Sequence, residues 1–336
     1  MKITTCRLGF VLLLVLTLRL PYSASASPAT TQCPSQGFDR FLIAFSTDLD
    51  LQSVLHARVV RRLTLTKTAD GVVPYQPLVD SRVLHFPLMK PAEPTLDSVV
   101  LSPDGQSATY TDKRAGLGNI KVYTFQKTQT CWSLTGIEDW SVPDSHLKLL
   151  GTPGMFLAEQ RCAARADIYG QLGGPERYPL TAEFYQASEE YWVCAAASGN
   201  PEASLAAASL SMSEMAPELG LAQTEKLYRA AAKTTPDAWA LLASISCDGA
   251  DPSYFGPCKA PQRALAILEQ AAASSNPQVL DVVGDVLSGH GDKELQDQPR
   301  ALACYRAAVE AGSKKAQVDV DRLQAAGVEE GGRTCL

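Results

Sequence analysis

Hydrophobic and polar positions follow two different patterns that meet near residue 150. Before it, alternating apolar and polar positions predict strands over 59–67, 82–86, 99–102, 107–111, 120–125 and 130–136. Residues 38–45 instead have the i, i+3, i+4, i+7 apolar spacing of an amphipathic helix. We therefore predict an α+β domain with an antiparallel sheet over 33–142.

After Pro153 the sequence consists of Ala-rich stretches in which apolar residues have helical spacing. Helices are predicted over 155–169, 181–198, 223–233, 237–247, 261–274, 277–288, 298–311 and 315–326, with another that starts at Pro201. We expect an all-α region over 154–327, followed by a C-terminal tail over 328–336.

A short motif recurs in this second region. WVCAAASGNPEA begins at Trp192, and related segments begin at Tyr228, Leu268 and Tyr305, at spacings of 36, 40 and 37 residues. A unit of this length with an Ala-Ala centre and a turn of small residues is typical of stacked helical hairpins. Because one hairpin cannot bury its apolar face alone, the pattern predicts an α-solenoid.

The first 26 residues have the features of a secretion signal. Lys2 and Arg7 precede an apolar run over 8–18, which is too short to span a bilayer as a helix. Small residues follow, and we expect cleavage after Ala26, with Ala24 as the alternative. This predicts a periplasmic protein without a membrane span once the signal is removed.

Removal of the signal makes the chain more acidic. It takes away Lys2, Arg7 and Arg19, which leaves 27 basic against 36 acidic residues, a net charge of −9. Nucleic acids and anionic lipids need clustered Lys and Arg, so neither is expected as a partner. A basic protein partner is compatible with this charge, and so is a surface that is acidic only for solubility.

Eight of the nine cysteines remain after Cys6 is removed with the signal. An even number in an exported chain favours disulfides, although eight cysteines allow 105 pairings. We predict nearest-neighbour pairs: Cys33–Cys131, Cys162–Cys194, Cys247–Cys258 and Cys304–Cys335. The sequence has no CxxC and no Cys/His cluster, so we expect neither a metal nor a cofactor.

The segments YRAAVEAGSKKAQ and WVCAAASGNPEA resemble Sel-like repeats, relatives of tetratricopeptide repeats with a slightly longer unit. The resemblance covers about residues 154–327. It departs from the family pattern at Thr234-Thr235 and Ser274-Ser275, where the family usually has Gly. It implies a protein-binding module. The opening FDRFL…FSTD…LQ resembles secreted domains of the nuclear-transport-factor-like class.

We find no catalytic motif of the GxSxG, HExxH or P-loop type. The four histidines lie in different segments without matched spacing, so we expect no enzyme activity. An enzyme would instead require a pocket in the α+β domain, for which Asp48, His56 and His85 are the candidates.

Tyr254 and Phe255 form an aromatic pair in a polar segment between two cysteines. Rigid surface aromatics suit a binding hot spot, so we assign them to partner binding; the alternative is that both rings pack on the helices below. Exported Sel-like proteins of this size resemble immunity proteins that neutralise lipase effectors of type VI secretion. That resemblance implies a secreted lipase as the partner, and the alternative is an envelope scaffold or regulatory adaptor.

Overall fold

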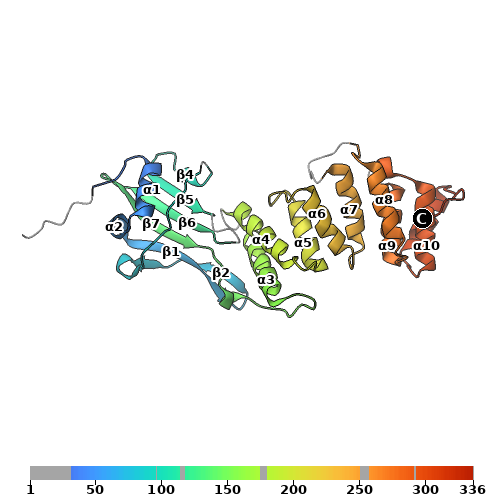
Figure 1. Ribbon diagram of the computed structural model, residues 1–336, viewed down its shortest axis with the longest axis horizontal. Coiled ribbons are helices and arrows are strands. Elements are labelled where there is room, and N and C mark those ends of the chain that lie inside the picture. Colours follow the sequence, from blue (N-terminus) through green and yellow to red (C-terminus); the bar gives the residue numbers. More distant parts are fainter. Residues whose placement is uncertain are drawn as a thin grey trace, which may run out of the picture.

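The computed structural model describes residues 32–95, 97–113, 118–174, 180–249, 257–290 and 293–335. The chain forms an elongated molecule, with a β-sheet region at one end and helices that follow one another to the C-terminus (Figure 1). The expected signal peptide, residues 1–26, lies outside the described residues, as do Tyr254 and Phe255.

Two short helices open the described chain. α1 (Phe38–Thr47) has the amphipathic spacing expected of it, with Phe38, Phe41, Leu42 and Phe45 buried. Asp48 ends this helix and caps α2 (Leu49–Val54), because its carboxylate accepts hydrogen bonds from the backbone N–H groups of Asp50 and Leu51.

A seven-stranded sheet follows, in the order β2-β1-β7-β6-β5-β4, with β3 paired to β1. The strands are β1 (His56–Thr68), β2 (Gly71–Tyr75), β3 (Leu78–Asp80), β4 (Val99–Leu101), β5 (Ser107–Asp112), β6 (Lys121–Lys127) and β7 (Trp132–Asp139). The hairpin predicted around residues 103–105 is present, since β4 pairs antiparallel with β5.

Two predictions about the sheet are wrong. The strand expected over 82–86 is absent: Ser81–Val83 form a 3-10 turn, which the Asp80 carboxylate caps by accepting from the N–H of Arg82. The sheet is also not wholly antiparallel, because β1 pairs parallel with β7. Two parallel strands can be joined only by a long connection. Here that connection contains β2 to β6.

The two faces of the sheet are covered by different parts of the chain. On one face, the rings of Phe38, Phe41 and Phe45 lie 5.3 to 5.7 Å from the ring of Phe125 on β6. A disulfide between Cys33 and Cys131 joins the segment before α1 to the turn before β7. On the other face, Leu63, Val122 and Trp140 pack against the first two helices of the second region.

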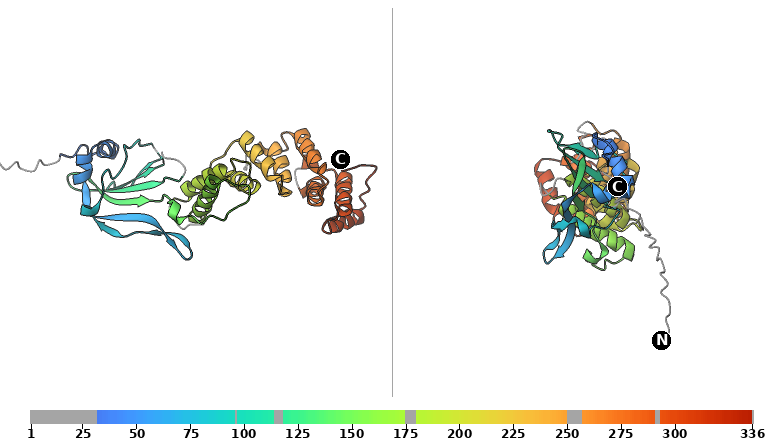
Figure 2. Two further views of the ribbon diagram at one scale, coloured as in Figure 1. Left: turned by 60° about the horizontal axis from the view of Figure 1, so that its bottom comes forward. Right: turned by 90° about the vertical axis from the view of Figure 1, so that its left-hand side faces the viewer.

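The second region holds nine α-helices within the described residues. They are α3 (Leu157–Leu172), α4 (Thr181–Ala195), α5 (Pro201–Ser211), α6 (Leu221–Ala231), α7 (Asp237–Asp248), α8 (Pro261–Ala272), α9 (Pro277–Asp285), α10 (Gln298–Glu310) and α11 (Ala316–Ala325). Each packs against the next along the chain, and a second direction of view shows the same progression along the long axis (Figure 2).

Fully buried alanines lie where these helices approach one another. Ala195, Ala231, Ala271 and Ala308 are each 0% exposed at or near the end of α4, α6, α8 and α10. One continuous cluster of buried residues runs from Cys162 to Cys335. Small side chains thus allow the close approach from which this core is built.

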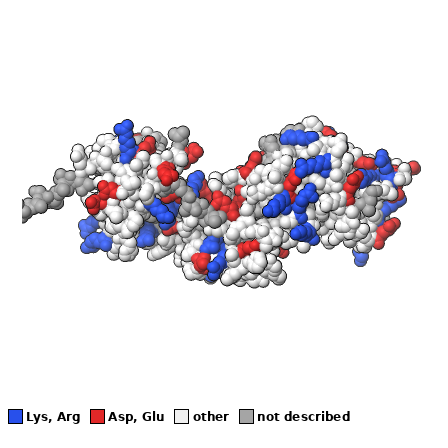
Figure 3. Space-filling view, in the orientation of Figure 1, with Lys and Arg blue, Asp and Glu red and all other residues white. Residues whose placement is uncertain are grey.

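Charged side chains also link alternate helices. Arg263 on α8 pairs with Glu225 on α6, and Arg300 on α10 pairs with Glu269 on α8 at 3.1 Å. On the face shown in Figure 3, Lys and Arg gather over the middle helices. Lys226, Arg229, Lys233, Lys259 and Arg263 are exposed in this part of the chain.

Three disulfides lie in the helical region, and their pairs are the nearest neighbours along the chain. Cys162–Cys194 joins α3 to α4, Cys247–Cys258 joins the end of α7 to the segment before α8, and Cys304–Cys335 joins α10 to the C-terminal segment. Disulfides persist in oxidising compartments, so four of them indicate an exported protein. Within the described residues, none of the helices is both long and apolar enough to cross a bilayer.

Candidate partner-binding groove between the sheet and the helices

The sheet and the first helix pair share one hydrophobic core. Trp140, which follows β7, lies edge-on to Phe184 of α4 with ring centroids 5.0 Å apart. Tyr169 of α3 is fully buried, and its hydroxyl lies within hydrogen-bonding distance of two carbonyl oxygens, that of Gly118 at 2.5 Å and that of Trp140 at 2.9 Å, between which its one proton is shared. Burial raises the pKa of Tyr169, so this hydroxyl remains a donor.

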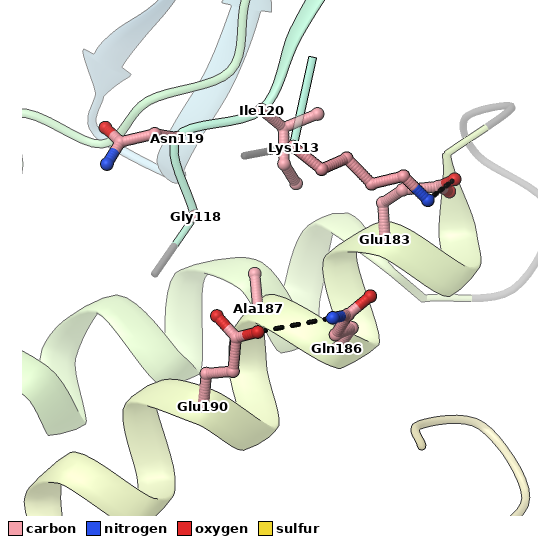
Figure 4. Close-up of a pocket in the computed structure, with 8 residues that line it drawn as sticks. All are labelled: Lys113, Gly118, Asn119, Ile120, Glu183, Gln186, Ala187 and Glu190. Atoms are coloured by element: carbon pink, nitrogen blue, oxygen red, sulfur yellow. Dashed lines mark hydrogen bonds and ion pairs between the residues drawn. The ribbon is translucent and has the colours of Figure 1, made fainter. Parts of the chain in front are cut away.

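The loop before β6 lies very close to α3. A Cβ at Gly118, whose φ is +73°, would lie 2.4 Å from a ring carbon of Tyr169, so only glycine fits there. Nearby, Lys113 forms an ion pair with Glu183 of α4 at 3.2 Å (Figure 4). The hollow between them has a volume of only about 20 Å³, room for about one water molecule. This contact therefore fixes the junction and is no ligand site.

A larger groove lies on another side of the same junction. It has a volume of about 350 Å³ and is open to solvent. Its walls come from the end of β1 and the start of β2, from α3, and from the segment that connects β7 to α3; the lining residues are Lys67, Thr68, Ala69, Gly71, Val72, His146, Lys148, Leu150, Ala164, Asp167, Ile168 and Gln171. Binding sites often occur where two folding units meet.

Charged groups lie at the edges of this groove around an apolar floor. Lys67 and Lys148 are exposed, whereas Val72 and Ile168 are half-buried. Partial burial raises the pKa of Asp167 on α3. His146 lies in the connecting segment, and its Nδ1 is enclosed without a hydrogen-bond partner in the described part of the chain. The groove therefore suits a mainly apolar ligand with polar groups at its ends.

The segment that connects the sheet to α3 exposes an unusual number of large apolar side chains. Within nine residues, Leu149 is 41% exposed, Leu150 74%, Phe156 72% and Leu157 55%. Such clusters on a soluble protein are typical of interaction sites. Leu150 also lines the groove, so groove and segment are contiguous at this residue.

Phe156 is held in place by a buried carboxylate. Glu159 of α3 is 6% exposed and accepts from the N–H of Phe156 at 2.9 Å. The same carboxylate accepts from the N–H and hydroxyl of Ser198, at 2.9 and 3.0 Å. The backbone of Phe156 is thus anchored to the turn between α4 and α5 while its ring faces solvent. An anchored backbone loses little further entropy when a partner covers the ring.

Asp48, His56 and His85, the candidates for a catalytic pocket, do not line the groove. Asp48 caps α2 and His85 is exposed. His56 is half-buried, with its Nδ1 3.0 Å from the carbonyl oxygen of Ala57 and its ring 6.2 Å from that of Phe86. Asp48 and His85 therefore do not have the environment expected of a catalytic pocket. The assignment of Tyr254 and Phe255 to partner binding stays a prediction.

The groove and its apolar border were not predicted from the sequence. The only local signal was the apolar pair at Leu149 and Leu150 and a second pair at Phe156 and Leu157, separated by Gly and Pro. Apolar pairs of this kind are indistinguishable from core residues in a sequence alone, since exposure depends on what packs above them.

Comparison with known proteins does not establish the family or the function of this chain. No protein-family model matches the chain, and no curated protein matches it. Among solved structures, the chain is similar to a Sel1 repeat protein from Oxalobacter formigenes, with 18% sequence identity and a TM-score of 0.32. The match covers 50% of this chain and 64% of that one. A likeness this weak assigns neither a family nor a function.

Proposed function

We propose that this chain is an exported protein-binding module and that the groove beside α3, with the exposed segment from Leu149 to Leu157, holds a segment of a partner protein. The observation that carries the proposal is the exposure of four large apolar side chains beside an open groove of about 350 Å³. Covering these side chains would remove apolar area from water at roughly 25 cal/mol per Å².

The helical region supports the same proposal. We infer that α3–α11 form a solenoid of about four Sel-like hairpins, because the sequence repeats at spacings of 36, 40 and 37 residues and consecutive helices pack together. An array of this kind offers a long surface for a partner. The shared core of Trp140, Tyr169 and Phe184 joins that surface to the sheet.

Periplasmic inhibition of a toxic effector is the finer form of the proposal. Its support is the sequence resemblance to immunity proteins that act on lipase effectors of type VI secretion, together with the disulfides that indicate an exported protein. If it holds, cells that produce this chain survive exposure to a secreted lipase encoded beside it, and cells that lack the chain are killed.

The experiment compares capture of a partner by matched variants. The test variant is Leu150→Asp with Phe156→Asp, which places charges on the exposed apolar segment. The control variant is Leu78→Asp with Val318→Asp, because these residues are similarly exposed, at 71% and 69%, but lie on β3 and α11. All forms are tagged, produced with the native signal and purified from the periplasm with bound proteins.

Wild type and control are expected to retain the same protein, and the test variant is expected to lose it while keeping the wild-type melting temperature. A retained toxin supports inhibition, and a retained housekeeping envelope protein supports the scaffold alternative. Equal retention by all three forms, or no retained protein at all, contradicts the assignment of this surface.

A further inference from the structure

Three aspartates from two helices lie close together near the C-terminal end of the array. Asp281 and Asp285 are four residues apart on α9 and therefore on one face of that helix. Asp319 comes from α11. One carboxylate oxygen of each residue lies within 4.8 Å of the corresponding oxygens of the other two. Three like charges at this separation repel one another unless cations lie among them.

Asp281 is the unusual member of this cluster. It is only 5% exposed, and its Oδ1 is enclosed without a hydrogen-bond partner among the described residues. Its other oxygen, Oδ2, accepts from the Nζ of Lys315 at 2.8 Å. A buried carboxylate with an unsatisfied oxygen is costly, since most buried polar atoms have partners. The unpartnered Oδ1 therefore indicates a ligand other than Lys315.

The ammonium group of Lys315 can be displaced by such a ligand. Its Nζ also lies 3.5 Å from Asp285, and its side chain is 69% exposed although Asp281 is buried. Lys315 and Arg322, which pairs with Asp319 at 3.0 Å, together supply two positive charges against three carboxylates. The flexible four-carbon stem of Lys315 allows its head group to move into solvent without any change of backbone.

The remaining members are oriented by their own partners. Asp285 accepts from the hydroxyl of the buried Tyr305 at 2.6 Å, and that hydroxyl lies 3.3 Å from the hydroxyl of Ser288. Asp319 accepts from the guanidinium of Arg322, one turn along α11, at 3.0 Å. Hydrogen bonds of this kind hold ligating carboxylates in position around a metal ion.

We propose that Asp281, Asp285 and Asp319 bind one calcium ion, with Lys315 displaced into solvent. The ligands are all carboxylate oxygens, which favours a hard cation over zinc or copper. Calcium accepts six to eight oxygens in flexible geometry, so three carboxylates and water suit it better than the strict octahedron of magnesium. Bound calcium would connect α9 to α11 in the part of the chain that Cys304–Cys335 also closes.

The sequence gives no local sign of this site, because its three aspartates do not form a recognisable motif. Asp281 and Asp285 share a helix face, but Asp319 joins them only through the packing of α9, α10 and α11. The proposal is independent of the proposed partner-binding function, since the aspartates lie on other helices than the groove.

Isothermal titration of the chelator-treated full mature chain with calcium chloride tests the proposal, with magnesium chloride as comparison. Wild type is expected to bind one calcium ion with a dissociation constant of about 10⁻⁴ to 10⁻³ M, the range of extracellular calcium modules. Lys315→Ala removes the competing cation and is expected to bind calcium about tenfold more tightly or better, the effect of removing a unit charge near 5 Å from a divalent ion in water.

Asp319→Asn is expected to lose calcium binding and remain folded, because Asp319 is only half-buried. Asp321→Asn, an exposed site on the same helix, is the matched control and is expected to bind like wild type. Absence of calcium binding by both wild type and Lys315→Ala at 10-fold above the expected dissociation constant overturns the proposal. Lys315 would then be the permanent counter-ion of the cluster. Equal binding by Asp319→Asn and wild type overturns it as well.

Discussion

The junction beside the sheet and the helices beyond it are held together by different kinds of packing. At the junction, Trp140, Tyr169 and Phe184 are large, buried and in ring contact. Farther along, the closest approaches are made by alanines such as Ala231 and Ala271, and charged pairs link alternate helices. Large rings fix one particular junction, whereas small residues allow a similar contact to be repeated along the chain.

This difference explains why the segment that connects the sheet to α3 is exposed. In the helical array each helix packs against the next. The apolar face of one helix is therefore buried by its neighbour. At the junction two dissimilar structures meet, and the segment from Leu149 to Leu157 has no equivalent neighbour to cover it. A partner protein would supply that cover, which is why we place the binding site there.

The largest expected effect comes from removing a ring at the junction. Phe184→Ala is expected to cost about 3–5 kcal/mol of unfolding free energy, because Phe184 is 0% exposed and the resulting cavity borders Trp140 and Tyr169. Chemical denaturation with tryptophan fluorescence measures it. A cost below about 1 kcal/mol would show that the sheet and helices are not stabilised by a shared core.

Adding volume in the array is expected to have a smaller effect. Ala271→Leu introduces a large side chain at a fully buried crossing on α8, which costs about 1–3 kcal/mol. Ala273→Leu is the matched control, since Ala273 is exposed directly after the same helix. If both variants unfold at the same denaturant concentration, that result would contradict the claim that helices pack closely at Ala271.

The last effect is seen only when the pH is changed, and it concerns a buried carboxyl group on α4. Glu189 of α4 is 2% exposed with an unpartnered Oε1, and burial raises its pKa to about 7. The folded state thus keeps a proton that the unfolded chain loses near pH 4.5. Stability is therefore expected to fall as the pH rises from about 4.5 to 7.

Glu189→Gln removes this titration while keeping the shape of the side chain. The variant is expected to match wild type near pH 4, where Glu189 is largely protonated in both the folded and the unfolded state, and to be more stable near pH 8. Thermal unfolding across this range is the measurement. Parallel stability curves for the two proteins would show that Glu189 does not titrate with a raised pKa.

Much of the helical region was predictable because its signals are local. Pro201, Pro261 and Pro277 stand at the first helical positions where they were expected, and the predicted helix bounds lie within three residues of those observed. In the sheet, β1 and β4–β7 were found from alternation, and β2 and β3 were missed. The parallel pairing of β1 with β7 depends on a contact between distant strands.

The candidate sites were harder to predict because they are assembled from distant residues. Lys67 on β1 and Ile168 on α3 line the same groove although about a hundred residues separate them. Asp319 joins Asp281 and Asp285 in the same way. No local spacing in the sequence encodes such proximity. Tyr254 and Phe255 were predicted as a binding site because they are adjacent in the sequence.

The most direct test of the central claim is the dissociation constant between the purified chain and the partner that it retains from the periplasm. Phe156→Ala is expected to weaken binding at least tenfold, since an exposed aromatic ring on an anchored backbone has the character of a hot spot. Val318→Ala, truncated at a similarly exposed position on α11, is expected to bind like wild type. Equal affinity of wild type and Phe156→Ala would contradict the account.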